Sequence, residues 1–136
     1  DKNNISTKDY EKKIKSEIEP FVVVPIIFIS TLKKQRIFKA LELAIKVYKN
    51  RSRKIKTSKL NDDLLEIISK NPPPSNKGKF VKIKFCNHLP GFYPQFVFYC
   101  NLPKYVKDPY KRFIENKIRN LYDFKGVPIT IYFRKK

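Results

Sequence analysis

The chain has 136 residues, enough for one domain or for a small domain plus part of another, and its formal net charge is +19. Two cysteines and one histidine exclude a disulfide scaffold and a thiolate zinc site. The sequence has no run of about 20 apolar residues and no signal-peptide pattern, so we expect a cytoplasmic protein without a membrane partner. It also lacks methionine, which suggests a fragment or a processed chain.

The positive charge has two explanations. A polyanion such as RNA is the usual partner of so basic a chain. However, lysines outnumber arginines by 25 to 6, and arginine is the residue that binds phosphate with two parallel hydrogen bonds. The enriched residue types also share A/T-rich codons, so genome composition can account for part of the lysine. The charge therefore supports RNA binding only in combination with other features.

The first third of the chain has the pattern of one end of an α/β domain. We predict a helix that begins at Ser6 or Thr7 and ends near Ile18. The continuously apolar run from Pro25 to Ser30 predicts a strand buried on both faces, as in parallel sheets. Such a strand needs neighbours that the chain does not contain, so we expect a truncated domain.

A second helix and a basic segment follow this strand. We expect the helix from about Gln35 to Arg51, and its buried face is predicted to contain Ile37, Leu41, Ile45 and Tyr48. Residues 51–56 are basic and lack apolar periodicity, which is typical of an exposed linker. We therefore divide the chain into residues 1–56 and 57–136.

Residues 57–136 predict a small α+β domain in the order α-β-β-α-β. One helix begins at Thr57 or Ser58 and ends before three prolines, and the other begins at Asp108 with proline next. Strands are predicted at residues 79–86, 95–100 and 129–134, the first two antiparallel. The helical residues expected in the core are Leu60, Leu64, Ile67, Ile68, Ile114, Ile118 and Leu121.

Alternation within the strands predicts one charged sheet face. Val81, Ile83 and Phe85 alternate with two lysines, so the apolar set is expected under the helices and the lysines on the open face. Alternation near the C-terminus adds Tyr132 to the open face. Cations beside an aromatic ring suit RNA, although a solvated face or one packed on another domain is an alternative. The RNA-binding candidates are Lys79, Lys82, Lys84 and Arg134 on the strands and Lys111, Arg112 and Arg119 on the last helix.

A set of residues spread over the second part of the chain occurs in a specific order. The set is Thr57-Ser58, Leu60-Asn61, Pro72-Pro73-Pro74-Ser75, Lys82-Ile83, Pro94, Phe96-Val97-Phe98, Asn101, Pro103, Tyr110, Arg112-Phe113, Glu115-Asn116, Ile118-Arg119, Phe124, Gly126, Pro128-Ile129 and Phe133-Arg134. In this set, residues 57–136 resemble the C-terminal KH-like domain of the Der (EngA) family, ribosome-assembly GTPases with two tandem GTPase domains. The resemblance implies a KH-like domain with a three-stranded sheet, preceded by a truncated P-loop GTPase domain.

Residues 1–56 resemble the end of the second GTPase domain of this family. The guanine-binding loop of the family usually reads Ser-Ala-Leu-Thr-Gly, and the chain reads Ser30-Thr31-Leu32-Lys33-Lys34. The resemblance implies that the Thr31 N–H meets the guanine oxygen, while the lost glycine affects the next turn. For a longer parent protein it implies GTP and magnesium as cofactors. The implied partners are ribosomal RNA of the large-subunit precursor and the parent's own GTPase domains.

The three glycines, Gly78, Gly91 and Gly126, exclude two phosphate-binding motifs. A P-loop needs two glycines five apart before Lys and Ser or Thr, and a KH clamp needs Gly-x-x-Gly. The sequence also offers no nucleophile–base pair and no metal cluster, so we expect no catalysis and no cofactor in this chain by itself. Any RNA contact must use the charged surface.

Two functions remain. The first is the C-terminal part of a GTP-binding ribosome-biogenesis GTPase, whose KH-like domain contacts ribosomal RNA and the GTPase domains. The alternative is a stand-alone basic RNA-binding module, which the truncated strand disfavours. The gene sequence upstream of Asp1 discriminates between them, because only the first function predicts an Asn-Lys-x-Asp motif there and two P-loops further upstream.

Overall fold

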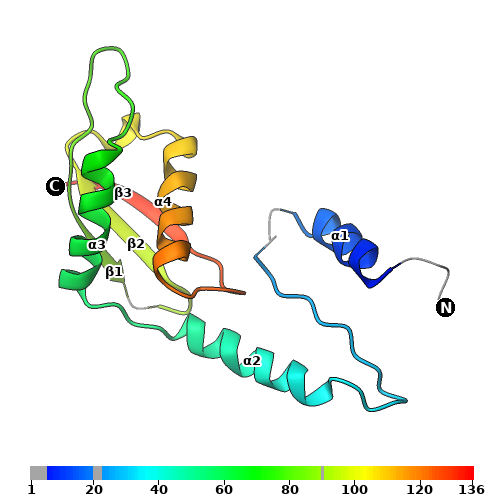
Figure 1. Ribbon diagram of the computed structural model, residues 1–136. Coiled ribbons are helices and arrows are strands. Elements are labelled where there is room, and N and C mark those ends of the chain that lie inside the picture. The colour runs from blue at the N-terminus through cyan, green and yellow to red at the C-terminus, as the bar shows by residue number, and fades with distance from the viewer. Residues whose placement is uncertain (1–5, 20–22, 90) are drawn as a thin grey trace.

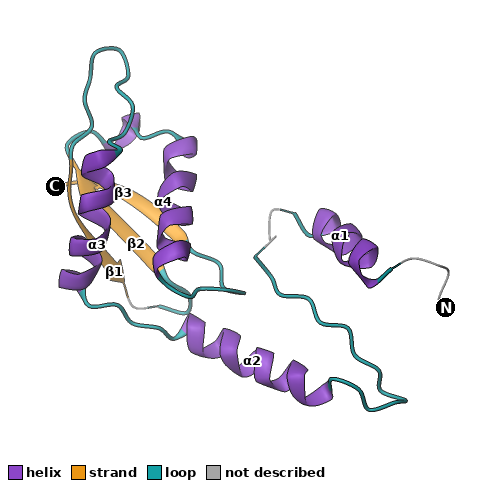
Figure 2. Cartoon of the chain, viewed as in Figure 1, coloured by secondary structure: helices purple, strands orange, loops and turns teal. Residues whose placement is uncertain are grey.

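A computed structural model describes residues 6–19, 23–89 and 91–136. It contains helices α1 (Thr7–Glu17), α2 (Ile37–Arg51), α3 (Thr57–Lys70) and α4 (Asp108–Leu121), the 3-10 helix η1 (Pro103–Tyr105), and strands β1 (Ile83–Leu89), β2 (Gln95–Cys100) and β3 (Thr130–Lys135). The order α-β-β-α-β of residues 57–136 is confirmed (Figure 1). A long loop separates α1 from α2, and both helices lie outside the α/β sandwich (Figure 2).

The three strands form one mixed sheet in the order β1-β2-β3. β1 is antiparallel to the central strand β2, and β3 lies parallel to β2 on its other edge. A parallel pair needs a crossover connection, which η1 and α4 provide. The central strand has neighbours on both edges, and Phe96, Val97 and Phe98 in it are fully buried.

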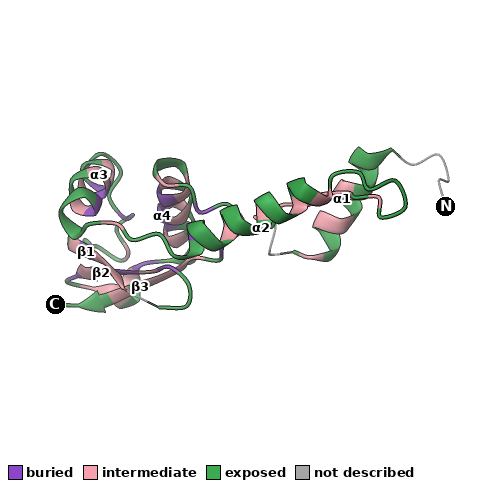
Figure 3. Ribbon diagram, turned by 90° about the horizontal axis from the view of Figure 1, so that it is seen from below, coloured by how far each residue is buried: buried purple, intermediate pink, exposed green. Residues whose placement is uncertain are grey.

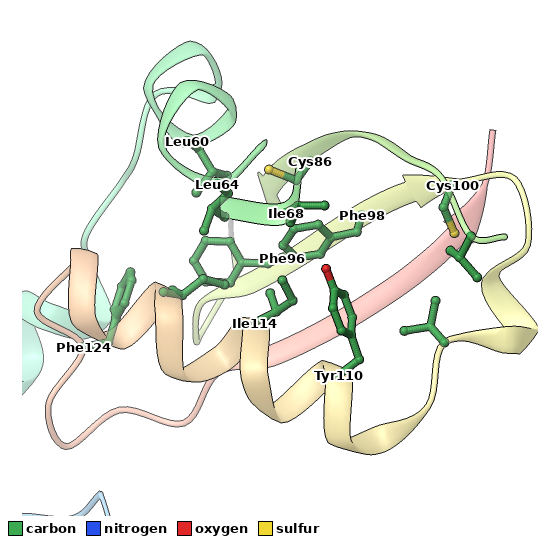
Figure 4. Packing of buried hydrophobic residues seen from close by; sticks show 13 residues of the cluster. Leu60, Leu64, Ile68, Cys86, Phe96, Phe98, Cys100, Tyr110, Ile114 and Phe124 are labelled. Carbon is green, nitrogen blue, oxygen red and sulfur yellow. The ribbon is translucent and has the colours of Figure 1, made fainter. Parts of the chain in front are cut away.

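Helices α3 and α4 lie side by side on one face of this sheet (Figure 3). Their inward positions recur every three or four residues, so one stripe of each helix reaches the sheet. Figure 4 shows Phe96 and Phe98 of β2 pointing into the space between the two helices. The core residues on the helices are Leu60, Leu64, Ile68, Tyr110, Ile114 and Ile118.

The expected core position of Leu121 was wrong. Its side chain is 42% exposed, and Leu121 is the last residue of α4. Phe124, three residues later, is buried in its place. The hydroxyl of Tyr122 donates to Asp63 Oδ2 at 2.6 Å, which fastens this end of α4 to α3. Burial, reinforced by Asp63, raises the pKa of Tyr122.

A β-bulge changes which side chains of β1 reach the core. Ile83 lies opposite Cys100 and Phe85 opposite Tyr99, so Lys84 is the extra residue. Phe85 consequently lies on the open face, where its ring stacks on Tyr99 with centroids 4.5 Å apart. The prediction that Phe85 packs under the helices was wrong, and Cys86 takes that place in the core. The strand also begins at Ile83, later than the sequence suggested.

The first part of the chain differs from expectation at two places. Residues 25–29 are extended but form no strand, and Ser30 makes only an isolated bridge to Gln35. A strand of a parallel sheet requires neighbours, and none is available among the described residues. The predicted buried face of α2 is exposed, by 57% at Leu41 and 55% at Ile45, because no sheet among the described residues covers it.

Candidate functional site

The face of the sheet opposite α3 and α4 is not covered by a helix of the described chain (Figure 3). The pairing of the strands places Phe85, Tyr99, Tyr132 and Arg134 on this open face, with Arg134 directly opposite Tyr99. The ammonium group of Lys136 lies 5.2 Å from the centre of the Phe85 ring. The open face therefore combines a stacked aromatic pair with cations at its edge.

The strand cations named from the sequence fall into three locations. Lys84, at the bulge, precedes Phe85 in the chain, and Arg134 on β3 lies opposite Tyr99; both side chains are exposed. Lys82 is exposed in the segment that enters β1. Lys79 lies in the loop beyond the end of the sheet, where its Nζ is 2.9 Å from the hydroxyl oxygen of Tyr105. Lys79 is thus separated from the open face.

The cations of α4 lie on the opposite side of the domain from the open face. Lys111 pairs with Asp108 at 2.8 Å, and this contact lowers the pKa of Asp108. Arg112 is exposed. Arg119 is held inside the domain, since its guanidinium pairs with Glu115 and also donates to two backbone carbonyl groups of residues 124 and 127. Lys111, Arg112 and Arg119 therefore do not form one surface with the cations of the strands.

The candidate guanine loop is a closed turn. Ser30 and Gln35 pair through two backbone hydrogen bonds of 3.2 and 2.9 Å. Lys34 has φ +50°, so it keeps the left-handed conformation at the position where the resemblance implies glycine. The Thr31 N–H takes no part in the hydrogen bonds found among the described residues, and Leu32 is 96% exposed. The loop can therefore offer one backbone donor to a guanine.

The rest of a GTP site does not fit the residues present. The sequence lacks a P-loop for the phosphates. No group of three or more His, Cys, Asp or Glu residues in the described ranges could hold a metal ion. Burial raises the pKa of the Cys86 thiol to about 12, so it is not a nucleophile. Within the same ranges, no helix is long and apolar enough to cross a membrane.

A joint between the two parts of the chain was missed from the sequence. Asn50, at the end of α2, is 2% exposed, and its Nδ2 donates at 3.1 Å to both Asp123 Oδ1 and the Lys125 carbonyl oxygen. The Gly126 N–H donates to the carbonyl oxygen of Val23 at 3.1 Å. One asparagine at a helix end carries no pattern that predicts such burial.

The basic segment after α2 is also attached more closely than expected. The N–H of Ile55 donates to Nδ1 of His88 at 3.3 Å, and the Ile55 side chain packs against the core. The His88 ring stacks on Phe96 with centroids 4.8 Å apart. His88 therefore serves as a structural acceptor for the linker backbone, a role that the sequence did not indicate.

Comparison with known proteins identifies the family. The family model for the C-terminal KH-domain-like region of EngA bacterial GTPase enzymes matches residues 54–134. The chain belongs to this family. The match begins within the basic segment and includes all of α3, the sheet strands to Arg134, and α4. It confirms the resemblance found in the sequence and the KH-like α+β fold.

The relatives extend beyond this domain. The GTPase Der of Christiangramia forsetii is 62% identical over 136 residues, and that of Flavobacterium psychrophilum is 60% identical over 136 residues. The GTPase Der of Bacteroides thetaiotaomicron is 53% identical over 137 residues. Each alignment covers 100% of this chain and 31% of the relative. The chain thus spans about a third of the length of these GTPases, and its first part aligns with them as well.

Proposed function

We propose that the chain is the C-terminal part of a GTP-binding GTPase that assembles the large ribosomal subunit in the cytoplasm. In this proposal residues 1–56 complete a GTPase domain and residues 57–136 are the KH-like domain. The relatives named GTPase Der support it. The exposed apolar face of α2 supports it too, because Phe38 (80% exposed) and Leu41 (57%) require the cover that the rest of an α/β domain supplies.

The KH-like domain is proposed to contact ribosomal RNA through its open sheet face. The observation that carries this proposal is the Phe85–Tyr99 stack with Arg134 and Lys136 beside it, on a face that α3 and α4 leave uncovered. Cations can track the phosphates while the rings meet bases. The alternative occupant of this face is a GTPase domain of the parent protein.

The salt dependence of RNA binding tests the open face. In the double variant K84Q/R134Q, the slope of log affinity against log salt is expected to become shallower by about 0.7 to 0.9 for each phosphate that the variant no longer neutralises. The matched control K12Q/K39Q removes the same charge from α1 and α2, outside the KH-like domain, and should keep the slope. Equal slopes in both double variants would move the RNA site away from this face.

Calorimetry with GTP tests the assignment of residues 1–56. The chain alone is expected to show no micromolar affinity, because phosphate and magnesium contacts dominate the binding of GTP and this chain has no P-loop. A longer protein that includes the upstream gene sequence should bind GTP and should contain Asn-Lys-x-Asp just before residue 1. An upstream sequence without this motif would favour a stand-alone RNA-binding module.

A further inference from the structure

The segments at one end of the KH-like domain carry lysines and no acidic residues, and the flanking carboxylates Glu66 and Asp108 are paired with Lys70 and Lys111. Residues 67–107 and 124–136 contain no Asp or Glu. The connection between α3 and β1 projects beyond the helix at this end, next to η1 (Figure 1). We call this region the basic end, and its residues are Lys77, Lys79, Phe80, Lys104 and Lys135. Lys135 and Lys104 line the same surface hollow, and Lys79 contacts Tyr105 of η1.

The projecting connection is a defined turn. Asn76 and Lys79 pair through two backbone hydrogen bonds of 3.1 and 3.0 Å. Between them Lys77 has φ +50° and Gly78 has φ +72°, the two left-handed residues of a type I′ turn. This turn fixes the position of Lys77 and the direction in which the chain continues to Phe80.

The segment after the turn is fixed by one side chain. Nδ2 of Asn101 donates to the Phe80 carbonyl oxygen at 3.0 Å, and Oδ1 of Asn101 accepts from the Lys82 N–H at 2.8 Å. Between these two residues Val81 is inserted in the core with 5% exposure. The backbone of Phe80 is thus held on both sides, while its ring is 75% exposed.

An exposed phenylalanine on a fixed backbone, with lysines around it, has the composition of a single-strand-binding surface. Such surfaces combine cations that follow the phosphates with an aromatic ring on which an unpaired base stacks. Phe92, the other highly exposed phenylalanine in the described part of the KH-like domain, differs because the Arg51 guanidinium lies 5.9 Å from its ring centre. Lysine charge alone would not distinguish the surface around Phe80 from that around Phe92, but the exposed Phe80 ring on a held backbone does.

We propose that the basic end binds an unpaired segment of RNA, with phosphates on Lys77, Lys79 and Lys104 and one base stacked on Phe80. This inference rests on the proposed RNA-binding function of the domain and adds a surface distinct from the open sheet face. The positive charge and the lack of carboxylates in these segments match a polyanion, and the ring selects unpaired over paired bases.

Fluorescence anisotropy of the whole 136-residue chain with a labelled oligouridylate tests the stacking contact. Phe80→Ala is expected to weaken binding by about 5- to 150-fold, the effect of removing one stacked base. Phe80→Trp should retain binding, and Phe92→Ala, the matched control, should leave it unchanged. Affinity for a duplex RNA should be equal in wild type and Phe80→Ala. An equal loss with duplex, or no loss with oligouridylate, would overturn the stacking assignment.

The charge contacts are tested with K77Q/K104Q against the control K12Q/K39Q. The basic-end variant should make the salt slope for oligouridylate shallower by roughly 0.7 for each phosphate left without its lysine, with an unchanged melting temperature. If K84Q/R134Q weakens binding while K77Q/K104Q and Phe80→Ala do not, this inference fails and the proposed function stands. If the wild-type chain binds neither oligouridylate nor duplex, both fail together.

Discussion

The side chain of Asn61 pairs with the backbone of Cys86 as a neighbouring strand would. Its Nδ2 donates to the Cys86 carbonyl oxygen and its Oδ1 accepts from the Cys86 N–H, both at 2.8 Å. Cys86 lies on β1, whose outer edge has no strand neighbour in the sheet. The helix α3 therefore covers the exposed edge at this point, which also discourages pairing with another chain.

Replacing Asn61 by alanine should lower the free energy of unfolding by about 1 to 3 kcal/mol, because a buried N–H and a carbonyl group both lose their partner. Asn120→Ala, at an exposed position of α4, is the matched control and should change stability little. Denaturant unfolding followed by circular dichroism measures both. A similar change in the two variants would mean that water replaces Asn61 without cost.

The helices of the KH-like domain were predicted correctly from the sequence for a physical reason. The stripe of Leu60, Leu64 and Ile68 and the helix-starting pair Asp108-Pro109 are local signals, so the helices and their inward faces could be predicted. The bulge at Lys84 could not, because alternation of apolar and charged residues continues through it. The exposure of Leu41 and Ile45 on α2 could not be predicted either, because burial of these side chains depends on neighbours that the described part of the chain does not supply.

The candidate site could also be predicted only in part, where it depends on local alternation along a strand. The placement of Arg134 and Tyr132 on the open face follows from strict period-two alternation on β3. The roles of Asn61 and Asn101 depend on tertiary contacts between residues 19 to 25 positions apart. No periodic pattern in a single sequence marks an asparagine that binds a distant backbone.

Acid should weaken the contact between the linker and His88. Burial lowers the pKa of His88, whose Nδ1 must remain unprotonated to accept the Ile55 N–H. Below about pH 6.5 the unfolded chain therefore binds a proton that the folded chain excludes, so stability falls as the pH decreases from there toward the folded-state pKa. Above this range the contribution is fully present.

The test measures the free energy of unfolding from about pH 8 to about pH 5.5 in wild type and His88→Gln. His88 is the only histidine, so this range isolates it from other side chains with ordinary pKa values. The wild type should lose stability below about pH 6.5, whereas glutamine, which accepts a hydrogen bond without titrating, should give a flat profile. An equal decline in both proteins would assign the effect to the carboxylates.

A methyl group at Gly126 should loosen the joint between the two parts of the chain. A Cβ there would lie 2.6 Å from Val47 Cγ2 and 3.0 Å from Pro25 Cδ, and the residue has φ +79°. Gly126→Ala should therefore accelerate amide exchange at residues 23–25 and 47–50. Gly78→Ala is the matched control, because Gly78 has φ +72° but no heavy atom within 4 Å of such a Cβ.

Each of these two substitutions carries a backbone cost of about 1 kcal/mol from the left-handed conformation. Only Gly126→Ala adds the clash, so the difference between the two variants measures the joint itself. Equal stability and equal exchange in both would mean that Val47 and Pro25 move aside freely, and that the joint contributes little to the position of α2.

The KH-like domain should fold without the residues that precede it. Every residue of the buried core cluster lies between Leu60 and Phe124, and Ile55 is the one earlier side chain that packs against it among the described residues. A chain that begins at Arg53 keeps Ile55 and its hydrogen bond to His88, while the polar partners of Asn50 become accessible to water. We expect a single calorimetric transition, with a melting temperature lowered by roughly 4–8 °C for each kcal/mol that the joint contributes. The loss of a cooperative transition on removal of residues 1–52 would contradict this boundary and make α2 part of the folding unit.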